Sequence, residues 1–442
     1  MNIIGELFGE IPNGWNIVRL SSYFKNEKNS IKAGPFGSQL TNTDMQGSDI
    51  KVYNQRTVLD RDFQNGEYYI SADKFEELKG FIVEPKDILV TTRGTIGKCI
   101  IVPNEIELGI LHPCLIKMKI NELKINLNYL EYIFNGTNIV KEQVQFLSNS
   151  TTIDVIYTQT LKDLKIVLPQ NISIQNKIVA YLDRKVAEID LLISKKEIKL
   201  NLLEQQRQSI ITEAVTKGLN PNVKMKDSGI EWIGEVPEHW EVNLLKRFLS
   251  KITDGSHFSP EIVDEGLPYV TVKDLKNGYI DTINALKISE EDYQALIKNG
   301  CKPNVNDVLL SKDGTIGKVA LVKESNFVVL SSLAILTPSH NVAPRYLEYW
   351  LNSLLNKEQM ESYLAGAALR RITLQTIGKL NMILPPMNEQ KEIVVYLDKK
   401  LKPVTDVINK VKQEINLIKE YRQSLIYEAV TGKIDLRELE LD

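Results

Sequence analysis

Residues 93–98 read RGTIGK and residues 313–318 read DGTIGK, so the chain contains nearly the same hexapeptide twice, 220 positions apart. Each copy lies between two apolar runs, as DILVTTRGTIGKCIIV (87–102) and DVLLSKDGTIGKVALV (307–322) show. A Walker phosphate loop needs G-x-x-x-x-G-K followed by Ser or Thr, whereas these glycines are three apart and neither residue type follows the lysine. Two β-rich runs around a glycine turn predict a β-hairpin in each copy.

The repetition extends along nearly the whole chain. Four further stretches recur at offsets of 215 to 225 residues: IPNGWNIVRL (11–20) with VPEHWEVNLL (236–245), KIVLP (165–169) with NMILP (381–385), QNKIVAYLDRKV (175–186) with QKEIVVYLDKKL (390–401), and RQSIITEAVTKGL (207–219) with RQSLIYEAVTGKI (422–434). Two long repeats indicate a pseudo-twofold molecule rather than a solenoid of short repeats.

Composition sets the broad class. The 442 residues leave room for two or more domains, and 43% hydrophobic with 25% charged residues is ordinary for a soluble protein. No apolar run is long enough for a membrane span, and the N-terminus lacks a signal-peptide pattern. Three scattered cysteines, Cys99, Cys114 and Cys301, favour a reducing cytoplasm over disulfides or a zinc site. A net charge of −3 does not by itself suggest nucleic-acid binding, although a local basic patch can bind phosphate beside an acidic surface.

Each repeat ends in a predicted long helix with a heptad pattern. The seam residues recur every seven positions: Leu182, Ile189, Leu203 and Ile210 in the first helix and Leu397, Val404, Val411, Ile418 and Leu425 in the second. A second set of apolar residues lies four residues after these heptad positions: Val186, Ile193, Leu200, Leu401, Ile408 and Ile415. Lys196 interrupts the first seam, and Pro403 either kinks the second helix or marks its start. An apolar stripe must be buried, so we expect the two helices, about 60 Å each, to pack as an antiparallel coiled coil.

The expected fold is therefore α+β and pseudo-twofold, with two duplicated β-rich domains separated by the two long helices. We expect one β-rich domain at 1–168, the central helix at 169–218, the second β-rich domain at 219–384, and the C-terminal helix with an acidic tail at 385–442.

The β-rich halves differ most in irregular polar stretches. AGPFGSQLTNTD (33–44) and DGSHFSPEIVDEG (254–266) open the two halves, and YNQRTV (53–58) and YVTVKDL (269–275) follow them. LAGAALRRITLQT (364–376) holds two arginines that its counterpart in the first half lacks. A shared scaffold with different loops is what two domains reading different targets require, although divergent loops can also be merely unconstrained.

These features together resemble the specificity subunit of type I restriction–modification systems. The linker GLNPNVKMKDSGIEWIGEVPEHWEV (218–242), the junction LPPMNEQKEIVVYLD (384–398), and the openings GPFGSQL and DGSHFSP are each similar to that family's motifs, and the resemblance covers both repeats. It implies that each recognition domain reads one half of a bipartite DNA site, and that the helices set the spacer and dock two methyltransferase subunits.

The resemblance also implies the partners: double-stranded DNA, the methyltransferase subunits and restriction subunits. No cofactor is then expected on this chain, because S-adenosylmethionine, ATP and Mg²⁺ serve adenine methylation and ATP-driven cleavage in the partners. The sequence has no N-P-P-[FY] methyltransferase signature, no Walker loop, and four separate histidines without metal-ligand spacing. We therefore expect no catalytic residue and no metal site.

The predicted DNA-contacting residues lie on the divergent stretches and on the hairpins. They are Lys32, Phe36, Ser38, Gln39, Asn54, Gln55, Arg56 and Arg93 in the first half, and His257, Ser259, Lys273, Asp274, Lys312, Arg370 and Arg371 in the second. Arg, Asn and Gln pair with guanine and adenine edges, whereas Lys32, Lys98, Lys312 and Lys318 are candidate phosphate contacts or plain surface lysines.

Other functions remain open at this point. The chain could be the specificity subunit of a methylation-only or fused system, a self-sufficient enzyme with a hidden site, or a coiled-coil adaptor that binds only proteins. The target sequence is not readable from the loops.

Overall fold

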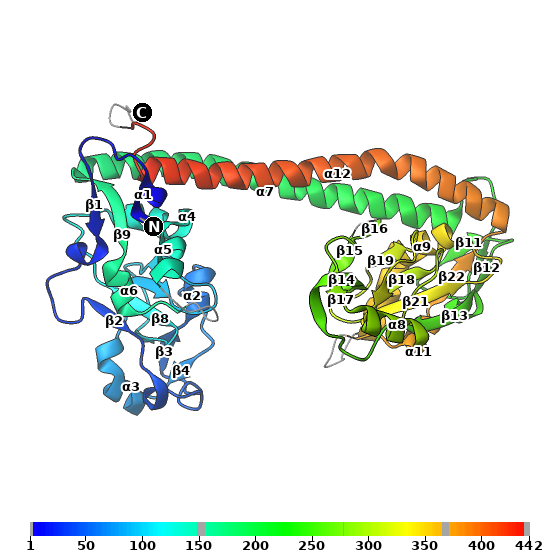
Figure 1. Cartoon of the computed structure of the whole chain (residues 1–442), viewed down its shortest axis with the longest axis horizontal. Helices are drawn as coiled ribbons and strands as arrows, with labels where there is room; N and C mark the ends of the chain where they lie inside the picture. The colour runs from blue at the N-terminus through cyan, green and yellow to red at the C-terminus, as the bar shows by residue number, and fades with distance from the viewer. Residues whose placement is uncertain (1–2, 148–154, 277, 365–370, 437–442) are drawn as a thin grey trace. The chain divides into compact units, whose positions relative to one another are not determined.

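The computed structural model describes residues 3–147, 155–276, 278–364 and 371–436. The chain divides into two compact units (Figure 1). Unit 1 combines Met1–Lys196 with Glu414–Asp442, and unit 2 is the continuous segment Glu197–Gln413. Each unit therefore holds one β-rich part and half of each long helix. Packing thus divides each long helix between the two units.

Unit 1 contains short strands and helices around small sheets. The strands are β1 (Trp15–Arg19), β2 (Ile31–Ala33), β3 (Ile50–Tyr53), β4 (Tyr69–Ile70), β5 (Ile88–Thr91), β6 (Cys99–Ile101), β7 (Gly109–Leu111), β8 (Leu115–Met118) and β9 (Lys165–Pro169). The helices are α1 (Ile3–Phe8), α2 (Gln55–Leu59), α3 (Ala72–Leu78), α4 (Leu127–Gly136), α5 (Ile139–Leu147) and α6 (Thr158–Asp163).

Unit 2 has the corresponding elements. The strands are β10 (Met225–Asp227), β11 (Glu235–Pro237), β12 (Glu241–Leu244), β13 (Leu249–Asp254), β14 (Ile262–Val270), β15 (Leu275–Lys276), β16 (Tyr279–Ile280), β17 (Leu286–Ile288), β18 (Val308–Ser311), β19 (Val319–Leu321), β20 (Val328–Val329), β21 (Leu333–Pro338) and β22 (Asn381–Leu384). The helices are α8 (Glu290–Lys298), α9 (Pro344–Asn352), α10 (Leu354–Leu364) and α11 (Leu374–Gly378).

The three sheets described in unit 1 each have a counterpart of the same topology in unit 2, which also contains the two-stranded sheets β10-β11 and β15-β16. The order β2-β8-β5-β6 in unit 1 matches β13-β21-β18-β19 in unit 2, β4-β3-β7 matches β17-β14-β20, and the pair β1-β9 matches β12-β22. In the three-stranded sheets one pairing is parallel, between β3 and β7 and between β14 and β20. The central strands β5 and β18 are buried along their whole length, as expected for apolar runs covered on both faces. This duplicated topology confirms the internal repeat.

The hexapeptides form the predicted hairpin turns. Val90 pairs with Cys99 in unit 1 and Leu310 pairs with Val319 in unit 2, both antiparallel. The turn glycines have φ between 66° and 83°, a conformation that favours glycine: Gly94, Gly97, Gly314 and Gly317. The hydroxyl before each turn closes it in the same way, since Thr91 Oγ1 and Ser311 Oγ each donate to a carbonyl four residues later and accept from a lysine amide. The motif is therefore a structural turn.

The two long helices are α7 (Ile172–Lys217) and α12 (Met387–Val430). At 46 and 44 residues they are slightly longer than expected, about 69 and 66 Å at 1.5 Å per residue. Asn171 begins α7, because its side chain accepts from the amide of Ser173, and Gly218 ends it at φ 74°. Pro403 lies inside α12 rather than at its start, so the second of the two expectations for this residue is wrong.

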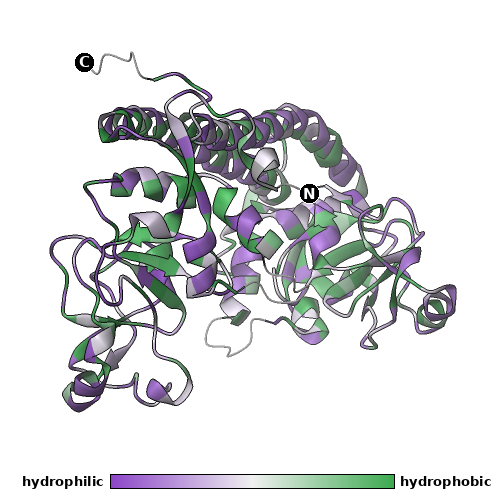
Figure 2. Cartoon of the chain, turned by 60° about the vertical axis from the view of Figure 1, so that its left-hand side comes forward, coloured by the Kyte–Doolittle hydropathy of each residue, from purple (hydrophilic) through white to green (hydrophobic). Residues whose placement is uncertain are grey.

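The heptad seam is buried as predicted within each unit. Leu182, Val186, Ile189, Ile193, Leu397, Leu401, Ile408, Val411, Ile415 and Leu425 are buried, and Leu200, Leu203, Ile210, Val404 and Ile418 are half-buried. Lys196, which breaks the apolar pattern, forms an ion pair of 2.7 Å with Glu414 on α12. Figure 2 shows hydrophobic residues concentrated on the strands and mostly hydrophilic residues on the outward surfaces of the long helices. Within the described residues, no helix is both long and apolar enough to cross a membrane.

Candidate nucleic-acid interface

In unit 1, four segments far apart in the sequence meet beside the hairpin turn. A Cβ atom added to Gly34 would lie 2.1 Å from the carbonyl oxygen of His112, so the two backbones touch there. His112 N donates to Tyr53 O at 3.0 Å, and Thr92 N donates to Cys114 O at 3.0 Å. The divergent loop, the segment after β3, the loop after β7 and the hairpin turn are therefore held together by backbone contacts.

Unit 2 gathers the equivalent segments in the same way. A Cβ atom on Gly255 would lie 2.0 Å from Val329 O, and Ser256 N donates to that oxygen at 2.8 Å. Leu330 N donates to Val270 O at 3.0 Å, and Lys312 N donates to Ser332 O at 2.8 Å. We call these regions the loop edges: residues 33–40, 53–56, 92–97 and 112–114 in unit 1, and 254–260, 270–274, 312–317 and 330–332 in unit 2.

One further segment contacts each loop edge through an equivalent backbone hydrogen bond. Ile156 N donates to Thr92 O at 3.0 Å, and Ile372 N donates to Lys312 O at 2.9 Å. Arg371 thereby sits against the hairpin turn of unit 2. Arg370 lies outside the described residues, so its predicted role stays a prediction.

Unit 1 presents much of its predicted set to solvent. Phe36 is 54% exposed, and Ser38, Gln39, Arg56 and Arg93 are exposed as well. Gln39 Oε1 accepts from Phe36 N at 3.0 Å, which orders the turn that displays the aromatic ring. Arg93 has no hydrogen bond or ion pair to any other described residue of the loop edge. This edge therefore offers an arginine, an amide and an aromatic side chain.

Other predicted residues of unit 1 have internal roles. Asn54 caps α2 by accepting from Thr57 N at 3.2 Å, and Arg56 forms an ion pair with Glu67. Gln55 is half-buried beside the hairpin turn, with its Nε2 3.7 Å from a Cβ built on Gly94. Lys32 Nζ lies 4.1 Å from the centre of the Phe81 ring. Burial, with Lys117 and Lys28 nearby, lowers the pKa of Lys32.

Unit 2 links its predicted residues through a chain of hydrogen bonds and ion pairs. His257 Nε2 lies 3.2 Å from Asp254 Oδ2, and Lys312 Nζ lies 3.3 Å from the same oxygen. Lys312 Nζ also lies 3.4 Å from Asp313 Oδ2, and Arg371 Nε lies 3.0 Å from Asp313 Oδ1. His257 and Arg371, both exposed, are thus held at the two ends of one network.

The two lysines expected at hairpin ends are anchored internally. Lys98 Nζ donates to Asn135 O at 3.0 Å and Lys318 Nζ donates to Val272 O at 3.1 Å. Burial lowers the pKa of Lys98. Both lysines brace the hairpins against neighbouring elements of their own unit.

Two expectations for unit 2 are wrong. Lys312 has only 2% of its surface exposed, and its ammonium is enclosed by two carboxylates, so it cannot reach a phosphate as a surface lysine would. Asp274 is buried as well, and its carboxylate accepts from the amide and the hydroxyl of Thr271 in a capping box. Lys273 and Ser259 are exposed. The polar pattern of the sequence did not show which side chains of these segments point outward.

The aspartates that organise this network, Asp254 and Asp313, were missed from the sequence. A usable signal was present, because Asp313 is the one position where the two hexapeptides differ and Arg93 replaces it in unit 1. Asp254 likewise corresponds to Ala33, and Lys312 to Thr92. The positions that differ between the repeats are thus the positions that set the charge of each loop edge.

Comparison with known proteins places this architecture in a family. The sequence model of the type I restriction modification DNA specificity domain matches residues 12–202 and again 237–417. The chain is 23% identical to the EcoBI specificity subunit of Escherichia coli, covering 80% of this chain and 75% of that one. It is 25% identical to the putative MjaX specificity subunit of Methanocaldococcus jannaschii, covering 97% and 96%.

A solved structure has the same fold. It concerns complex assembly and conformational transition of the type I R-M system, and its chain aligns with a TM-score of 0.61 and 16% identity over 96% of this chain and 100% of that one. The chain therefore belongs to the type I restriction modification DNA specificity domain family, and it carries the family domain twice.

Proposed function

We propose that this chain is the DNA sequence-specificity subunit of a type I restriction–modification complex, in which each loop edge reads one half of a bipartite target. The observation that carries the proposal is the pair of loop edges: one backbone arrangement occurs twice and bears different side chains each time. Two copies of one scaffold, each with its own exposed side chains to contact bases, can recognise two different half-sites.

In unit 1, the readers are the exposed side chains. Arg93 and Gln39 have the donors and acceptors that pair with guanine and adenine edges in the major groove. Phe36, more than half exposed on an ordered turn, suits an apolar contact such as a thymine methyl group. Ser38 adds a small hydroxyl that can reach a base or a phosphate.

In unit 2, the readers are the ends of the charge network. Arg371 and His257 face solvent while Asp313 and Asp254 hold them in place. Lys312 is a positioning residue, because it is buried between the two carboxylates and keeps both in place. A donor held by a fixed partner loses less conformational freedom when it meets a base.

The long helices serve as the docking surface for methyltransferase subunits and set the spacing of the half-sites. Their seams are buried, yet both helices also carry exposed apolar residues, as a partner surface needs: Leu191, Leu192, Ile198, Leu202, Val395, Val407, Leu417 and Tyr421. We assign catalysis to the partners, with S-adenosylmethionine used by the methyltransferase and ATP with Mg²⁺ by a restriction subunit. The chain itself is non-catalytic and acts in the cytoplasm.

The test is to express the chain with its methyltransferase subunit and to map methylated adenines across the host genome. We expect one bipartite motif with a fixed unspecified spacer. Replacing residues 226–383 by the corresponding domain of another family member should change one half of the motif and leave the other intact. A change in both halves, or methylation without this chain, contradicts the proposal.

A further inference from the structure

Each unit contains a cavity where the long helices meet its β-rich part, and the two cavities are equivalent. The unit 2 cavity has a volume of about 450 Å³ and the unit 1 cavity about 460 Å³. Their linings correspond at offsets of 215 to 217 residues: Arg207 with Arg422, Glu348 with Glu131, Tyr349 with Tyr132, Asn352 with Asn135, and Asp398 with Asp183. The duplication thus preserved a pocket as well as a fold.

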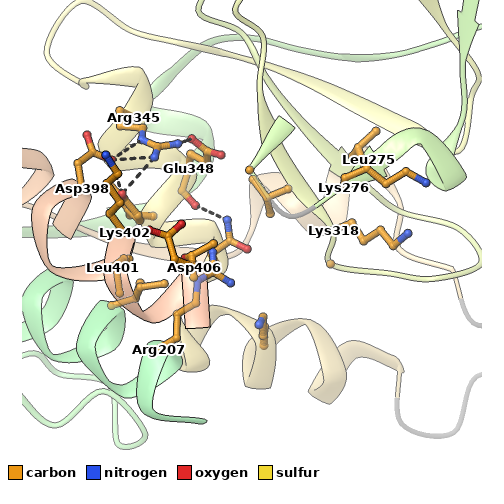
Figure 3. A pocket seen from close by; sticks show the side chains of 18 residues that line it. Arg207, Leu275, Lys276, Lys318, Arg345, Glu348, Asp398, Leu401, Lys402 and Asp406 are labelled. Atoms are coloured by element: carbon orange, nitrogen blue, oxygen red, sulfur yellow. Dashed lines mark hydrogen bonds and ion pairs between the residues drawn. The ribbon is translucent and has the colours of Figure 1, made fainter. Parts of the chain in front are cut away.

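One side of this pocket has the same tyrosine–aspartate pair in both units. Tyr132 Oη donates to Asp183 Oδ1 at 2.7 Å, and Tyr349 Oη donates to Asp398 Oδ1 at 2.5 Å. In unit 2, Arg345 completes this side by pairing with both Glu348 and Asp398 (Figure 3). Both carboxylates on this side of the unit 2 cavity are therefore already paired with Arg345.

On the opposite side of the cavity, one residue that matters for charge differs between the two units. In unit 1, Arg422 makes a two-pronged ion pair, with Nε 2.7 Å from Asp190 Oδ1 and Nη2 3.1 Å from Asp190 Oδ2. The residue of unit 2 that corresponds to Asp190 is Thr405. Arg207, the counterpart of Arg422, has no hydrogen bond or ion pair to any described residue, and its Nε is buried without a partner.

Arg207 is one of several cations in the lining of the unit 2 cavity. Lys276, Lys318, Lys357 and Lys402 also line this cavity, and Asp406 is the one lining carboxylate that is not already paired with Arg345. Burial and the nearby charge of Arg207 lower the pKa of Lys357, whose Nζ donates to Gln208 Oε1 at 2.6 Å. A buried donor without an acceptor is costly, and an anion would satisfy it.

We propose that the unit 2 cavity, the Arg207 pocket, binds a phosphate-type oxyanion that takes the place of the carboxylate of Asp190 in unit 1. Arg207 donates guanidinium N–H groups to oxygens of the anion, as Arg422 does to Asp190, and Lys357 neutralises part of the remaining charge. The same chemistry can come from free phosphate or a nucleotide, or from a DNA backbone phosphate. Binding of the free ion does not depend on the DNA-reading role proposed above.

The test is calorimetric titration of inorganic phosphate into the full-length chain without DNA, with circular dichroism melts to show that every variant is folded. Arg207→Gln should weaken phosphate binding about tenfold or more, since charge-assisted bonds are lost. Thr405→Asp should abolish binding by supplying the internal carboxylate. Arg422→Gln is the matched control and should leave phosphate binding unchanged.

The reciprocal change, Asp190→Thr, frees Arg422 in unit 1 and should create a weaker second phosphate site, because none of the described residues that line that cavity is a lysine. If the wild-type chain binds no phosphate, or if Arg207→Gln and Thr405→Asp bind it as the wild type does, the pocket is not an anion site. A duplex oligonucleotide then separates the sources, because displacement of bound phosphate by DNA indicates a backbone phosphate, and retention indicates a free ion. Both results require the Arg207 pocket to be an anion site.

Discussion

Gln175 and Gln390 make the same three hydrogen bonds in the two units. Gln175 Oε1 accepts from Asn126 N at 2.9 Å, and its Nε2 donates to Pro169 O at 3.1 Å and Lys124 O at 3.4 Å. Gln390 Oε1 accepts from Ala343 N at 2.7 Å, and its Nε2 donates to Pro385 O at 2.8 Å and to Asn341 O at 2.9 Å. Both side chains are fully buried. Each glutamine joins the start of a long helix to the β-rich part of its unit.

Replacing Gln390 by Leu should destabilise unit 2 by about 3 kcal/mol or more, because one amide and two carbonyls lose their buried partner. Urea denaturation followed by fluorescence and circular dichroism measures the change. Gln205→Leu on the exposed surface of α7 is the control and should stay within about 0.5 kcal/mol. Equal effects of the two substitutions would show that the buried amide contributes nothing specific.

Replacing Lys312 by Thr should destabilise unit 2 by roughly 1–3 kcal/mol, because two neighbouring carboxylates lose their shared cation. Adding Asp254→Ala recreates the Thr92 and Ala33 pair of unit 1 and should restore much of the lost stability. Since Lys312 is buried, DNA affinity should change at one half-site while its salt dependence stays the same. A salt slope that falls by about one unit would instead show a direct phosphate contact.

Adding a methyl group at either close backbone contact should disturb one half-site only. Gly34→Ala pushes the divergent loop of unit 1 away from His112, and Gly255→Ala does the same at Val329 in unit 2. We expect genome-wide adenine methylation to lose preference in the first half of the target for one variant and in the second half for the other. Each variant serves as the control for the other. Loss of both halves in either variant would mean that the two loop edges are not independent readers.

The stability of unit 1 should depend on pH through His112. Burial lowers the pKa of this imidazole from its ordinary 6.5, and its Nδ1 accepts from Cys114 N at 3.1 Å, which requires the unprotonated nitrogen. The unfolded chain therefore takes up the proton first as the pH falls. Its contribution is fully present above about pH 6.5 and is lost as the pH drops from there toward the folded-state pKa.

The measurement is urea denaturation of the wild type and of His112→Asn at pH 7.5 and pH 5.5. Asparagine can accept the same hydrogen bond without titrating, so the variant should lose less stability between the two pH values. An identical loss in both proteins would assign the pH dependence to other groups.

Lengthening both long helices should lengthen the target spacer. The chain passes from one unit to the other between Lys196 and Glu197 in α7, and between Gln413 and Glu414 in α12. Four residues inserted at each point add about 6 Å, close to two base pairs, and nearly preserve the apolar stripe. We expect both half-sites to persist with a longer spacer in the methylation map. An unchanged spacer at full activity would leave the helices as a docking surface only.

The internal repeat predicted the fold because the same spacing of apolar and turn residues occurs in both halves of the sequence. The hairpins at the two hexapeptides and the seam from Leu397 to Leu425 follow directly from period and spacing. The candidate site was predictable only as a set of segments. Whether Lys312 faces solvent depends on Asp254, a residue 58 positions away whose contact with it the sequence pattern does not reveal. The side chains of Asn54 and Asp274 form hydrogen bonds in helix caps with residues close to them in the sequence. The polarity of a residue alone does not show whether its side chain is engaged in such a local hydrogen bond.

The way in which the chain is divided between the units has a consequence for synthesis on the ribosome. Unit 2 is one continuous segment that ends at Gln413, whereas unit 1 needs the final stretch from Glu414, including Tyr427, whose hydroxyl donates to Leu7 O at 2.6 Å. Although unit 1 is translated first, it is the last to obtain all its parts, so the usual N-to-C order of domain completion is reversed. A premature stop codon shortly after the codon for Gln413 would therefore leave unit 2 whole and damage unit 1, which begins before it in the chain.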